Sequence, residues 1–525
     1  MPGSAPAKAI LWRAAAALLI GIAHGLSFSP VASGLAQLIL FAAAWLLVTG
    51  IGRVPAVVGW RPALVIGWAF GVGHFVAGIG WIYISMHDIG GLPAPLAALA
   101  VLLLSAYLAA FGACAFALTK RLAGTSLAAI GVLAASWTLV EWLRAVLFTG
   151  FPWLAIGYAH VDSWLIGLAP WLGVWGVTFV AVASAGALAN LFAIAFERPP
   201  RPRAIALRVA LPMLLAAIAL GGGRIELTRP TGQAMRVRLL QGNVPQAMKF
   251  EPRRAVQAMN DYIDAIAAEP ADLIVLPETA FTVPWVSVPP VIRQRLHDAQ
   301  RQAGALVSVG IPMPVDERQR ERQPRAHLTN SVITLDETGR IVHRYDKRHL
   351  VPFGEFVPPG FRWFVNLMNI PLGDFGRGQA HQALLTVAGN ALAFDICYED
   401  LFADEMREQV LDGANILVNV SNIGWFGRSH AVTQHLNISR MRARELGRPL
   451  LRATNTGATA AIDADGRVTA ILPYHEPGSL TATVRGRAGL TGYARWGDTP
   501  MLLLALVITL AGLAGARARR RPRAA

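Results

Sequence analysis

The sequence predicts a polytopic α-helical membrane bundle of eight spans joined to an α/β domain outside the cytoplasm. The 525-residue chain is 54% hydrophobic and only 15% charged, which is too apolar for an ordinary soluble protein of this size. The pattern also changes along the chain. Residues 1–223 are a series of long apolar runs, whereas residues 235–485 alternate short apolar strands with amphipathic helices, as layered α/β domains do.

Eight apolar stretches are long enough to cross a bilayer. The first has the apolar run of a signal peptide but lacks a convincing small-residue cleavage site, and further spans follow it. We therefore interpret it as a retained helix. The first seven stretches form the bundle of residues 1–223, and the eighth follows the α/β domain. The stretches lie at about 9–28, 32–52, 62–85, 92–119, 125–149, 164–196, 204–222 and 499–516.

The distribution of basic residues predicts the orientation. Lys and Arg gather in alternate connections and in the tail of residues 517–525, and the other connections contain none. This positive-inside pattern places the N-terminus and the tail in the cytoplasm and the α/β domain outside it. No nucleic-acid recognition motif accompanies the net charge of +15, so topology explains that charge better than nucleic-acid binding does. The basic connections contain Lys8, Arg13, Arg53, Arg61, Lys120, Arg121, Arg198, Arg201, Arg203 and Arg208.

The α/β segment is large enough for a core of its own. Turn residues at 336–339 and 463–466 predict hairpins. Strands are expected at Val237–Gln241, Leu273–Leu276, Ala305–Ile311, Asn330–Leu335, Ala391–Ile396 and Ile416–Val420. Helices are expected at Pro252–Ala268, Pro290–Ala303, Phe402–Leu411 and Ala431–Leu446.

Three polar side chains in this segment lie in apolar surroundings: Glu278, Lys347 and Cys397. A carboxylate, an ammonium group and a thiol in such places indicate a base, an anion stabiliser and a nucleophile. Each alone has an ordinary interpretation, as a helix-start acid, a solvated strand residue and a small buried hydrophobe. Their combination favours catalysis. His349 and His430 are weaker partners for the thiol, because neither lies in a motif suited to orient a base.

The motifs LPET, YDKRHLVPFGE and FDICYED together resemble the carbon–nitrogen hydrolase (nitrilase) superfamily and its Glu-Lys-Cys triad. QGNVPQ, VNVSNIGWFG and the surrounding spans narrow the resemblance to the apolipoprotein N-acyltransferase family of the bacterial inner membrane. The resemblance implies a nitrilase-like α-β-β-α sandwich in the periplasm. It also implies no metal, no organic cofactor and a monomer.

The resemblance further implies the last step of lipoprotein maturation. An acyl chain moves from a phospholipid, typically phosphatidylethanolamine, to a thioester on Cys397. It then moves to the α-amino group of the diacylglyceryl-cysteine that begins an apolipoprotein. The partners expected are therefore the phospholipid donor, the apolipoprotein acceptor and the lipid bilayer.

The residues fit distinct roles in such a reaction. Glu278 is expected to take the proton of the thiol, and its apolar setting is expected to raise its pKa. Lys347 is expected to stabilise the oxyanion of each tetrahedral intermediate. Glu355 is expected to orient Lys347 or Glu278, Glu399 to hold the turn around the nucleophile, and Tyr398 to pack or hydrogen-bond beside it.

A lipid substrate needs an apolar surface near the triad. Aromatic residues gather in loop-like sequence between positions 353 and 375 and again at 425–426. They predict lids that enter the bilayer, the alternative being that they belong to the core. Phe250 stands where many relatives have tryptophan. The expected substrate-binding residues are Phe250, Phe353, Phe356, Trp363, Phe364, Trp425 and Phe426.

Two other functions compete with acyl transfer. A membrane-tethered amidase would use the same triad with water as the final acceptor, but it would not need so many spans. A transporter or scaffold carrying an inactive hydrolase domain would not need an intact triad, and the spans contain no evident repeat. His24 and Glu141 lie inside predicted spans, where they either face the bundle interior or contact substrate.

Overall fold

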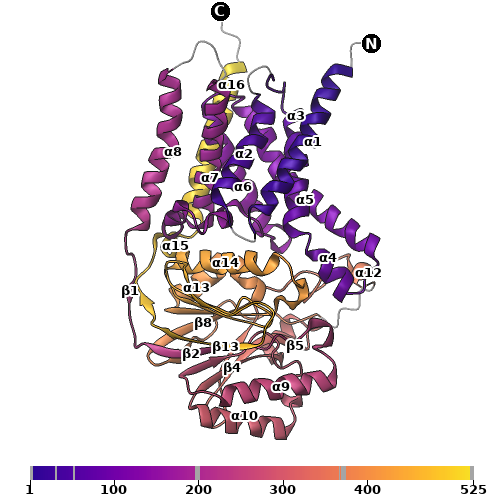
Figure 1. Cartoon of the computed structure of the whole chain (residues 1–525), viewed down its shortest axis with the longest axis vertical. Helices are drawn as coiled ribbons and strands as arrows, with labels where there is room; N and C mark the ends of the chain where they lie inside the picture. The colour runs from indigo at the N-terminus through magenta and orange to yellow at the C-terminus, as the bar shows by residue number, and fades with distance from the viewer. Residues whose placement is uncertain are drawn as a thin grey trace, which may run out of the picture. The chain divides into compact units, whose positions relative to one another are not determined.

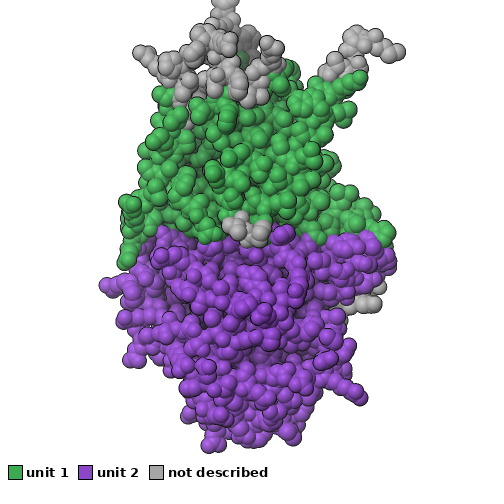
Figure 2. Space-filling model, viewed as in Figure 1, with its two compact units in different colours: residues 1–80, 95–226, 496–525 green, residues 81–94, 227–495 purple. Residues whose placement is uncertain are grey.

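The computed structural model describes residues 4–29, 32–50, 54–195, 202–365, 367 and 374–520. The chain divides into two compact units, which Figure 2 colours separately. Unit 1 comprises residues 1–80, 95–226 and 496–525, and unit 2 comprises residues 81–94 and 227–495. Unit 2 therefore includes a short piece of chain from the apolar N-terminal half.

Unit 1 is built from long apolar helices. Six of the helices that the structure describes are long and apolar enough to cross a membrane, and Gly34–Thr49 and Pro212–Gly223 are shorter apolar helices. The 16 residues of α2 extend about 24 Å, less than the roughly 30 Å of a bilayer's hydrocarbon core. Six of the eight predicted spans thus correspond to helices that are both long and apolar enough to cross a membrane. The helices are α1 (Ser4–Leu26), α2 (Gly34–Thr49), α3 (Arg61–Ile79), α5 (Ala94–Leu122), α6 (Ala128–Val146), α7 (Ala169–Ala195), α8 (Pro202–Gly223) and α16 (Thr499–Arg520).

Helices α1 and α3 approach each other closely because glycines line their contact. A Cβ added at Gly21 would lie 2.0 Å from the carbonyl oxygen of Phe70. A Cβ added at Gly73 would lie 2.1 Å from the carbonyl oxygen of Leu18. Small residues at helix contacts are typical of membrane bundles, where close backbone packing replaces the hydrophobic effect.

The polar groups of the predicted spans find partners inside unit 1. His24 Nδ1 lies 3.0 Å from His74 Nδ1. The Gln37 side chain bridges two histidines: its Nε2 lies 3.2 Å from His24 Nε2, and its Oε1 lies 2.9 Å from His160 Nε2. The Glu141 carboxylate accepts the backbone N–H of residue 156 at 3.3 Å. His24 and Glu141 are both buried. They therefore face the interior of unit 1, one of the two alternatives left open by the sequence.

Unit 2 contains two six-stranded sheets among its described residues, in the orders β12-β11-β10-β9-β8-β7 and β13-β2-β3-β4-β5-β6. The strands of the first sheet are β7 (Leu385–Val387), β8 (Asn390–Ile396), β9 (Ile416–Ser421), β10 (Leu450–Thr454), β11 (Ala460–Ile462) and β12 (Val468–Ile471). Those of the second are β2 (Met235–Gln241), β3 (Leu273–Val275), β4 (Leu306–Pro314), β5 (Leu328–Leu335), β6 (Ile341–Asp346) and β13 (Gly478–Val484). The main helices are α9 (Pro252–Ala267), α10 (Pro290–Ala303), α13 (Ala403–Leu411) and α14 (Ala431–Leu446).

The two sheets pack face to face between layers of helices. Leu239 of one sheet and Phe394 of the other belong to the same buried apolar cluster. Ile263 of α9 and Leu296 of α10 belong to a second cluster, with buried residues on the outer face of the β2–β6 sheet. Helices α13 and α14 lie on the opposite side of the strands (Figure 1). This is the predicted α-β-β-α sandwich.

The piece of chain between α3 and α5 packs within unit 2. Trp81 Nε1 donates to Gln434 Oε1 of α14 at 3.0 Å, and the indole ring lies 4.3 Å from the ring of Phe426. A Cβ on Gly427 would lie 3.1 Å from the Ile84 side chain. Residues 81–94 therefore fold as part of the sandwich unit, which the sequence did not predict.

Candidate active site

Glu278, Lys347 and Cys397 each lie just after the end of a strand. They follow β3, β6 and β8 respectively. Strands β3 and β8 lie in the parallel parts of the two sheets, and the carboxyl ends of parallel strands are where open α/β sheets place their functional groups. The structure thus brings together the three side chains that the motifs singled out.

Lys347 is a buried cation between two carboxylates. Its Nζ lies 3.3 Å from Glu278 Oε1 and 2.9 Å from Glu355 Oε1, and its side chain is 1% exposed. Burial favours the neutral amine, but the charges of Glu278 and Glu355 outweigh it and raise the pKa of Lys347. Lys347 therefore carries a fixed positive charge at neutral pH.

The Glu278 carboxylate is held from both sides. Oε1 accepts from Asn330 Nδ2 at 2.7 Å, and Oε2 accepts from the Asn422 N–H at 2.8 Å. Burial tends to raise the pKa of Glu278, but Lys347, Asn330, Lys249 and Asn422 together lower it below its usual value. The expected rise is wrong in its net direction, because burial here comes with cations and N–H donors.

A glycine on the neighbouring strand makes room for the turn that carries Glu278. A Cβ on Gly310 of β4 would lie 2.2 Å from the Pro277 carbonyl oxygen and 2.8 Å from the Glu278 Cα. Thr279, the next residue, has a φ of 48°, a left-handed conformation that a β-branched residue rarely adopts. The turn is therefore both closely packed and strained.

Cys397 begins a short 3₁₀ turn (Cys397–Leu401) and has a φ of 55°. Such conformations cluster at functional sites, because the surrounding structure has to impose them. Burial and then the Glu278 carboxylate raise the pKa of Cys397, while Lys347 and the Asn422 N–H oppose the rise. At neutral pH Cys397 is thus a protonated thiol beside an ionised carboxylate, and a nucleophilic role for it requires transfer of the proton.

Glu355 is placed to orient Lys347. Its Oε1 accepts from Asn330 Nδ2 at 2.7 Å as well as from Lys347, and its Oε2 accepts from the Val351 N–H at 2.8 Å. Asn330 therefore joins the carboxylates of Glu278 and Glu355. The Glu355 carboxylate thus contacts Lys347 directly and is linked to Glu278 through Asn330.

Glu399 joins the strand end before the nucleophile to the chain after Lys347. The side chain is 2% exposed, and both of its carboxylate oxygens accept hydrogen bonds. Tyr398 is also buried, with its ring 5.2 Å from that of Phe402. The donors to Glu399 are the N–H groups of Arg348 (2.6 Å), His349 (2.9 Å) and Ile396 (2.6 Å) and the hydroxyl of Tyr345 (3.0 Å).

Glu399→Gln is expected to lower the free energy of unfolding by about 2–4 kcal/mol. The amide oxygen of glutamine can accept the hydrogen bonds made to one carboxylate oxygen. The amide NH₂ is itself a donor, so it faces the donors of the other oxygen and leaves them without an acceptor. Thermal unfolding in detergent and the alkylation rate of the Cys397 thiol, read by peptide mass spectrometry, measure the two effects. Glu317→Gln, at an exposed position, is the control. Wild-type stability in Glu399→Gln would contradict the expectation.

A buried polar network below the nucleophile was not predicted. His435 Nε2 lies 2.7 Å from Asp400 Oδ1 and 3.1 Å from the Cys397 carbonyl oxygen. Arg452 Nη2 donates to His435 Nδ1 at 2.7 Å, so the proton on the ring is at Nε2. Ser439 also donates to Asp400 at 2.6 Å. The acidic run after Cys397 was the only sequence signal for this network.

The histidines that the sequence suggested lie elsewhere. His349 Nδ1 lies 3.0 Å from Glu405 Oε1, and its ring stacks 3.4 Å from that of Phe402. His430 lies at the N-cap position of α14, and its side chain makes no capping hydrogen bond there. His435 makes a hydrogen bond to Cys397, and that bond goes to the backbone carbonyl oxygen.

The aromatic residues proposed to contact substrate differ in exposure. Trp363 is 64% exposed and Phe250 is 36% exposed, whereas Phe353 and Phe356 are partly buried. The Phe353 ring lies 5.4 Å from that of Phe361, and the Arg377 guanidinium lies 5.1 Å above the Phe356 ring. Trp425 and Phe426 are partly buried, and the side chain of Phe364 lies outside the described part of the structure.

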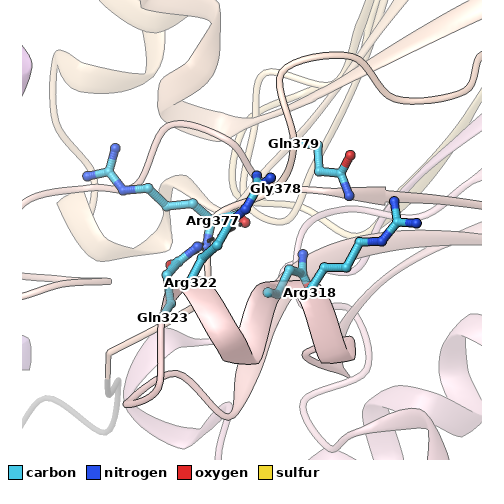
Figure 3. A pocket seen from close by; sticks show the side chains of 7 residues that line it. Arg318, Arg322, Gln323, Arg377, Gly378 and Gln379 are labelled. Carbon is cyan, nitrogen blue, oxygen red and sulfur yellow. Dashed lines mark hydrogen bonds between the residues drawn. The ribbon is translucent and has the colours of Figure 1, made fainter.

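A pocket without any triad residue lies beside the short helix α11 (Glu317–Arg322). In Figure 3, the side chains of Arg318 and Arg377 extend to opposite sides of it, so their guanidinium groups do not converge on one ligand. No group of three or more His, Cys, Asp or Glu side chains within the described ranges is placed to hold a metal ion. The pocket is lined by Arg318, Gln319, Arg322, Gln323, Arg377, Gly378 and Gln379.

The sandwich and its Glu-Lys-Cys cluster define a carbon–nitrogen hydrolase domain. The family model described as carbon-nitrogen hydrolase matches residues 236–493, and that of the apolipoprotein N-acyltransferase N-terminal domain matches residues 20–187. The apolipoprotein N-acyltransferase of Bordetella bronchiseptica is 43% identical, with 98% of this chain and 99% of that protein covered. That of Ralstonia nicotianae is also 43% identical, with 98% and 95% covered. The chain belongs to the apolipoprotein N-acyltransferase family.

Solved structures of an amidase also match. The amidase from Nesterenkonia sp. is 20% identical, with a TM-score of 0.36, and the match covers 50% of this chain and 93% of the amidase.

Proposed function

We propose that this protein is a phospholipid:apolipoprotein N-acyltransferase that completes lipoprotein maturation. The observation that carries the proposal is the Lys347 ammonium held between Glu278 and Glu355 beside Cys397, in a chain of this family. The arrangement supplies a nucleophile, a proton acceptor and a fixed cation for an oxyanion. The reaction needs no metal or organic cofactor, and the protein acts as a monomer.

The first half of the reaction forms a thioester. Glu278 takes the thiol proton as the Cys397 sulfur attacks the ester carbonyl of a phospholipid such as phosphatidylethanolamine. Lys347 stabilises the oxyanion of the tetrahedral intermediate. The intermediate collapses as protonated Glu278 returns the proton to the departing lysophospholipid oxygen. The low pKa of Glu278 keeps it ionised and ready to accept the proton at neutral pH.

The second half transfers the acyl chain to an amine. The neutral α-amino group of a diacylglyceryl-cysteine attacks the thioester carbonyl, and Lys347 again stabilises the oxyanion. Glu278 accepts a proton from the amine nitrogen, and the carbon–sulfur bond breaks. The proton then passes to the Cys397 sulfur, which regenerates the thiol and leaves an amide.

The membrane arrangement follows from charge and helix length. Residues 1–223 form seven spans of the bacterial inner membrane, residues 235–485 form the periplasmic catalytic domain, and residues 499–516 form the last span. The basic tail of residues 517–525 is cytoplasmic, and its residues 521–525 lie outside the described structure. The alternation of basic and non-basic connections supports this topology. α2, with 16 residues, is the span that needs a thinner local bilayer or flanking polar residues.

Trp363→Ala is expected to slow acyl transfer from a long-chain phospholipid roughly 10-fold while leaving transfer from a short-chain soluble ester unchanged. The side chain is 64% exposed, so its loss costs little stability and removes mainly a contact with lipid. Initial rates with the two donors measure the effect, and Trp496→Ala, at a position 67% exposed, is the control. An equal loss with both donors would contradict a lipid-binding role.

The proposed function is tested by supplying both substrates. The purified protein is incubated with phosphatidylethanolamine and a diacylglyceryl-cysteine peptide, and the peptide mass is followed. A gain of one acyl chain on the peptide amine supports acyl transfer. Hydrolysis of small amides without peptide acylation would move the assignment to a membrane-tethered amidase, and neither activity would favour a scaffold.

A further inference from the structure

Lys249 is a second buried lysine at the catalytic centre. It follows the short turn Gln246–Met248 after β2, and it is 3% exposed. Its Nζ donates to the Glu278 carbonyl oxygen at 3.1 Å and to the Thr279 hydroxyl at 2.8 Å. Both acceptors belong to the strained turn that packs closely on Gly310. Lys249 is therefore attached to the part of the backbone that aims the Glu278 carboxylate.

The charge of Lys249 acts on the same carboxylate. No carboxylate among the residues described by the structure forms an ion pair with Lys249, so its hydrogen bonds go to uncharged oxygens. Burial lowers the pKa of Lys249 to about 7, against the opposing influence of Glu278 and Cys397. Lys249 in turn contributes to the low pKa of Glu278. The Glu278 residue is thus bonded to two amines: Lys347 at its carboxylate and Lys249 at its backbone.

Burying the amine of Lys249 costs desolvation free energy. An apolar side chain of similar length would pack without the desolvation cost of an ammonium group. The Lys249 amine donates two hydrogen bonds to the turn and places a positive charge near the Glu278 carboxylate. A methionine side chain could do neither. No sequence motif singled out Lys249, because nothing in the sequence places it beside Glu278.

We propose that Lys249 is a positioning residue for the catalytic base: it holds the peptide of Glu278 and Thr279 in the strained turn and helps to keep the Glu278 carboxylate ionised. This inference rests on the proposed function, in which Glu278 takes the thiol proton. Lys249 does not touch the reacting atoms and acts through Glu278.

Two substitutions separate the hydrogen bonds from the charge. Lys249→Met removes both at similar length, whereas Lys249→Gln keeps an N–H donor and removes the charge. Arg253→Met removes an exposed positive charge nearby on α9 and is the control. The readouts are thioester formation from phosphatidylethanolamine, alkylation of the Cys397 thiol by iodoacetamide, and the Tm in detergent, the first two over about pH 4 to 9.

The expected result has a definite sign. Below about pH 7, Lys249 is protonated and lowers the pKa of Glu278, so its loss moves the acidic limb of both profiles to higher pH. Lys249→Met is expected to slow thioester formation on the order of 10- to 100-fold at the pH optimum, through misplacement of the base. Lys249→Gln is expected to recover most of that rate and to keep the shifted limb. Arg253→Met is expected to match the wild type.

Three outcomes would overturn the inference or separate it from the proposed function. Wild-type rates and an unshifted limb in Lys249→Met would overturn it. Slowing of both variants with a lower Tm but an unshifted limb would also overturn it, because that pattern describes a purely structural lysine. If the wild type forms no thioester, the proposed function fails, and the acidic limb of alkylation still decides whether Lys249 tunes Glu278.

Discussion

Cys397→Ala is expected to abolish acyl transfer, with a loss on the order of 10⁶-fold as for removal of other covalent nucleophiles. The left-handed backbone at Cys397 holds the sulfur beside Glu278 and Lys347, and alanine offers no atom that can form the acyl bond. Free Cys114 lies in α5, outside the sandwich unit, and is not expected to replace it.

Intact mass after incubation with phosphatidylethanolamine measures this loss. The wild type is expected to gain the mass of one acyl chain, and hydroxylamine is expected to remove it, because the bond is a thioester. Cys114→Ala, the control, is expected to keep the adduct. An adduct that persists in Cys397→Ala would place the nucleophile at another residue and refute the assignment.

Lys347→Met is expected to impair both stability and catalysis. Removing one partner of a buried ion pair costs about 3–5 kcal/mol, because the remaining charge is left uncompensated. Here two carboxylates, those of Glu278 and Glu355, lose their shared cation. A carboxylate left without its cation tends to take up a proton, and protonation of Glu278 removes the proposed base. Loss of the oxyanion stabiliser adds a factor of about 10²–10³ in rate.

The double variant Lys347→Met/Glu355→Gln separates these effects. Neutralising Glu355 removes one of the two unpaired charges, so the Tm in detergent is expected to rise from that of the single variant. Thioester formation is expected to stay low, because the oxyanion still lacks its cation. A double variant that recovers both stability and rate would show that Lys347 only balances charge.

Local sequence signals predicted part of the fold well. The helix Pro290–Ala303 was predicted with its observed bounds, because proline starts it and Gly304, with a φ of 60°, ends it. The hairpin at 336–339 forms as expected, with the Gly339 N–H donating to the Asp336 carbonyl at 2.8 Å. Strand β13 was missed: it is half exposed and depends on pairing with β2, far away in sequence.

In the candidate site, too, residues in local motifs were predicted, whereas properties that depend on contacts distant in sequence were not. Glu278, Lys347 and Cys397 were found because each lies in a motif at the end of an apolar strand. The direction of the Glu278 pKa shift was not predicted, because it depends on the contact of Lys347 with the carboxylate and on Asn330, Lys249 and Asn422 around it, and these groups come together only in the folded chain. His435 and Arg452 were missed for the same reason, since neither belongs to a local pattern.

The packing of Trp81 on Phe426 and Gln434 means that the catalytic unit is not one continuous stretch of the gene. A hydrolase domain exchanged between relatives as residues 227–495 alone would leave behind Trp81, which packs on the loop of Trp425 and Phe426. That loop would meet a foreign partner from the recipient's N-terminal half. The connection after α3 and the loop at 425–426 therefore have to be exchanged together if this packing is to be kept.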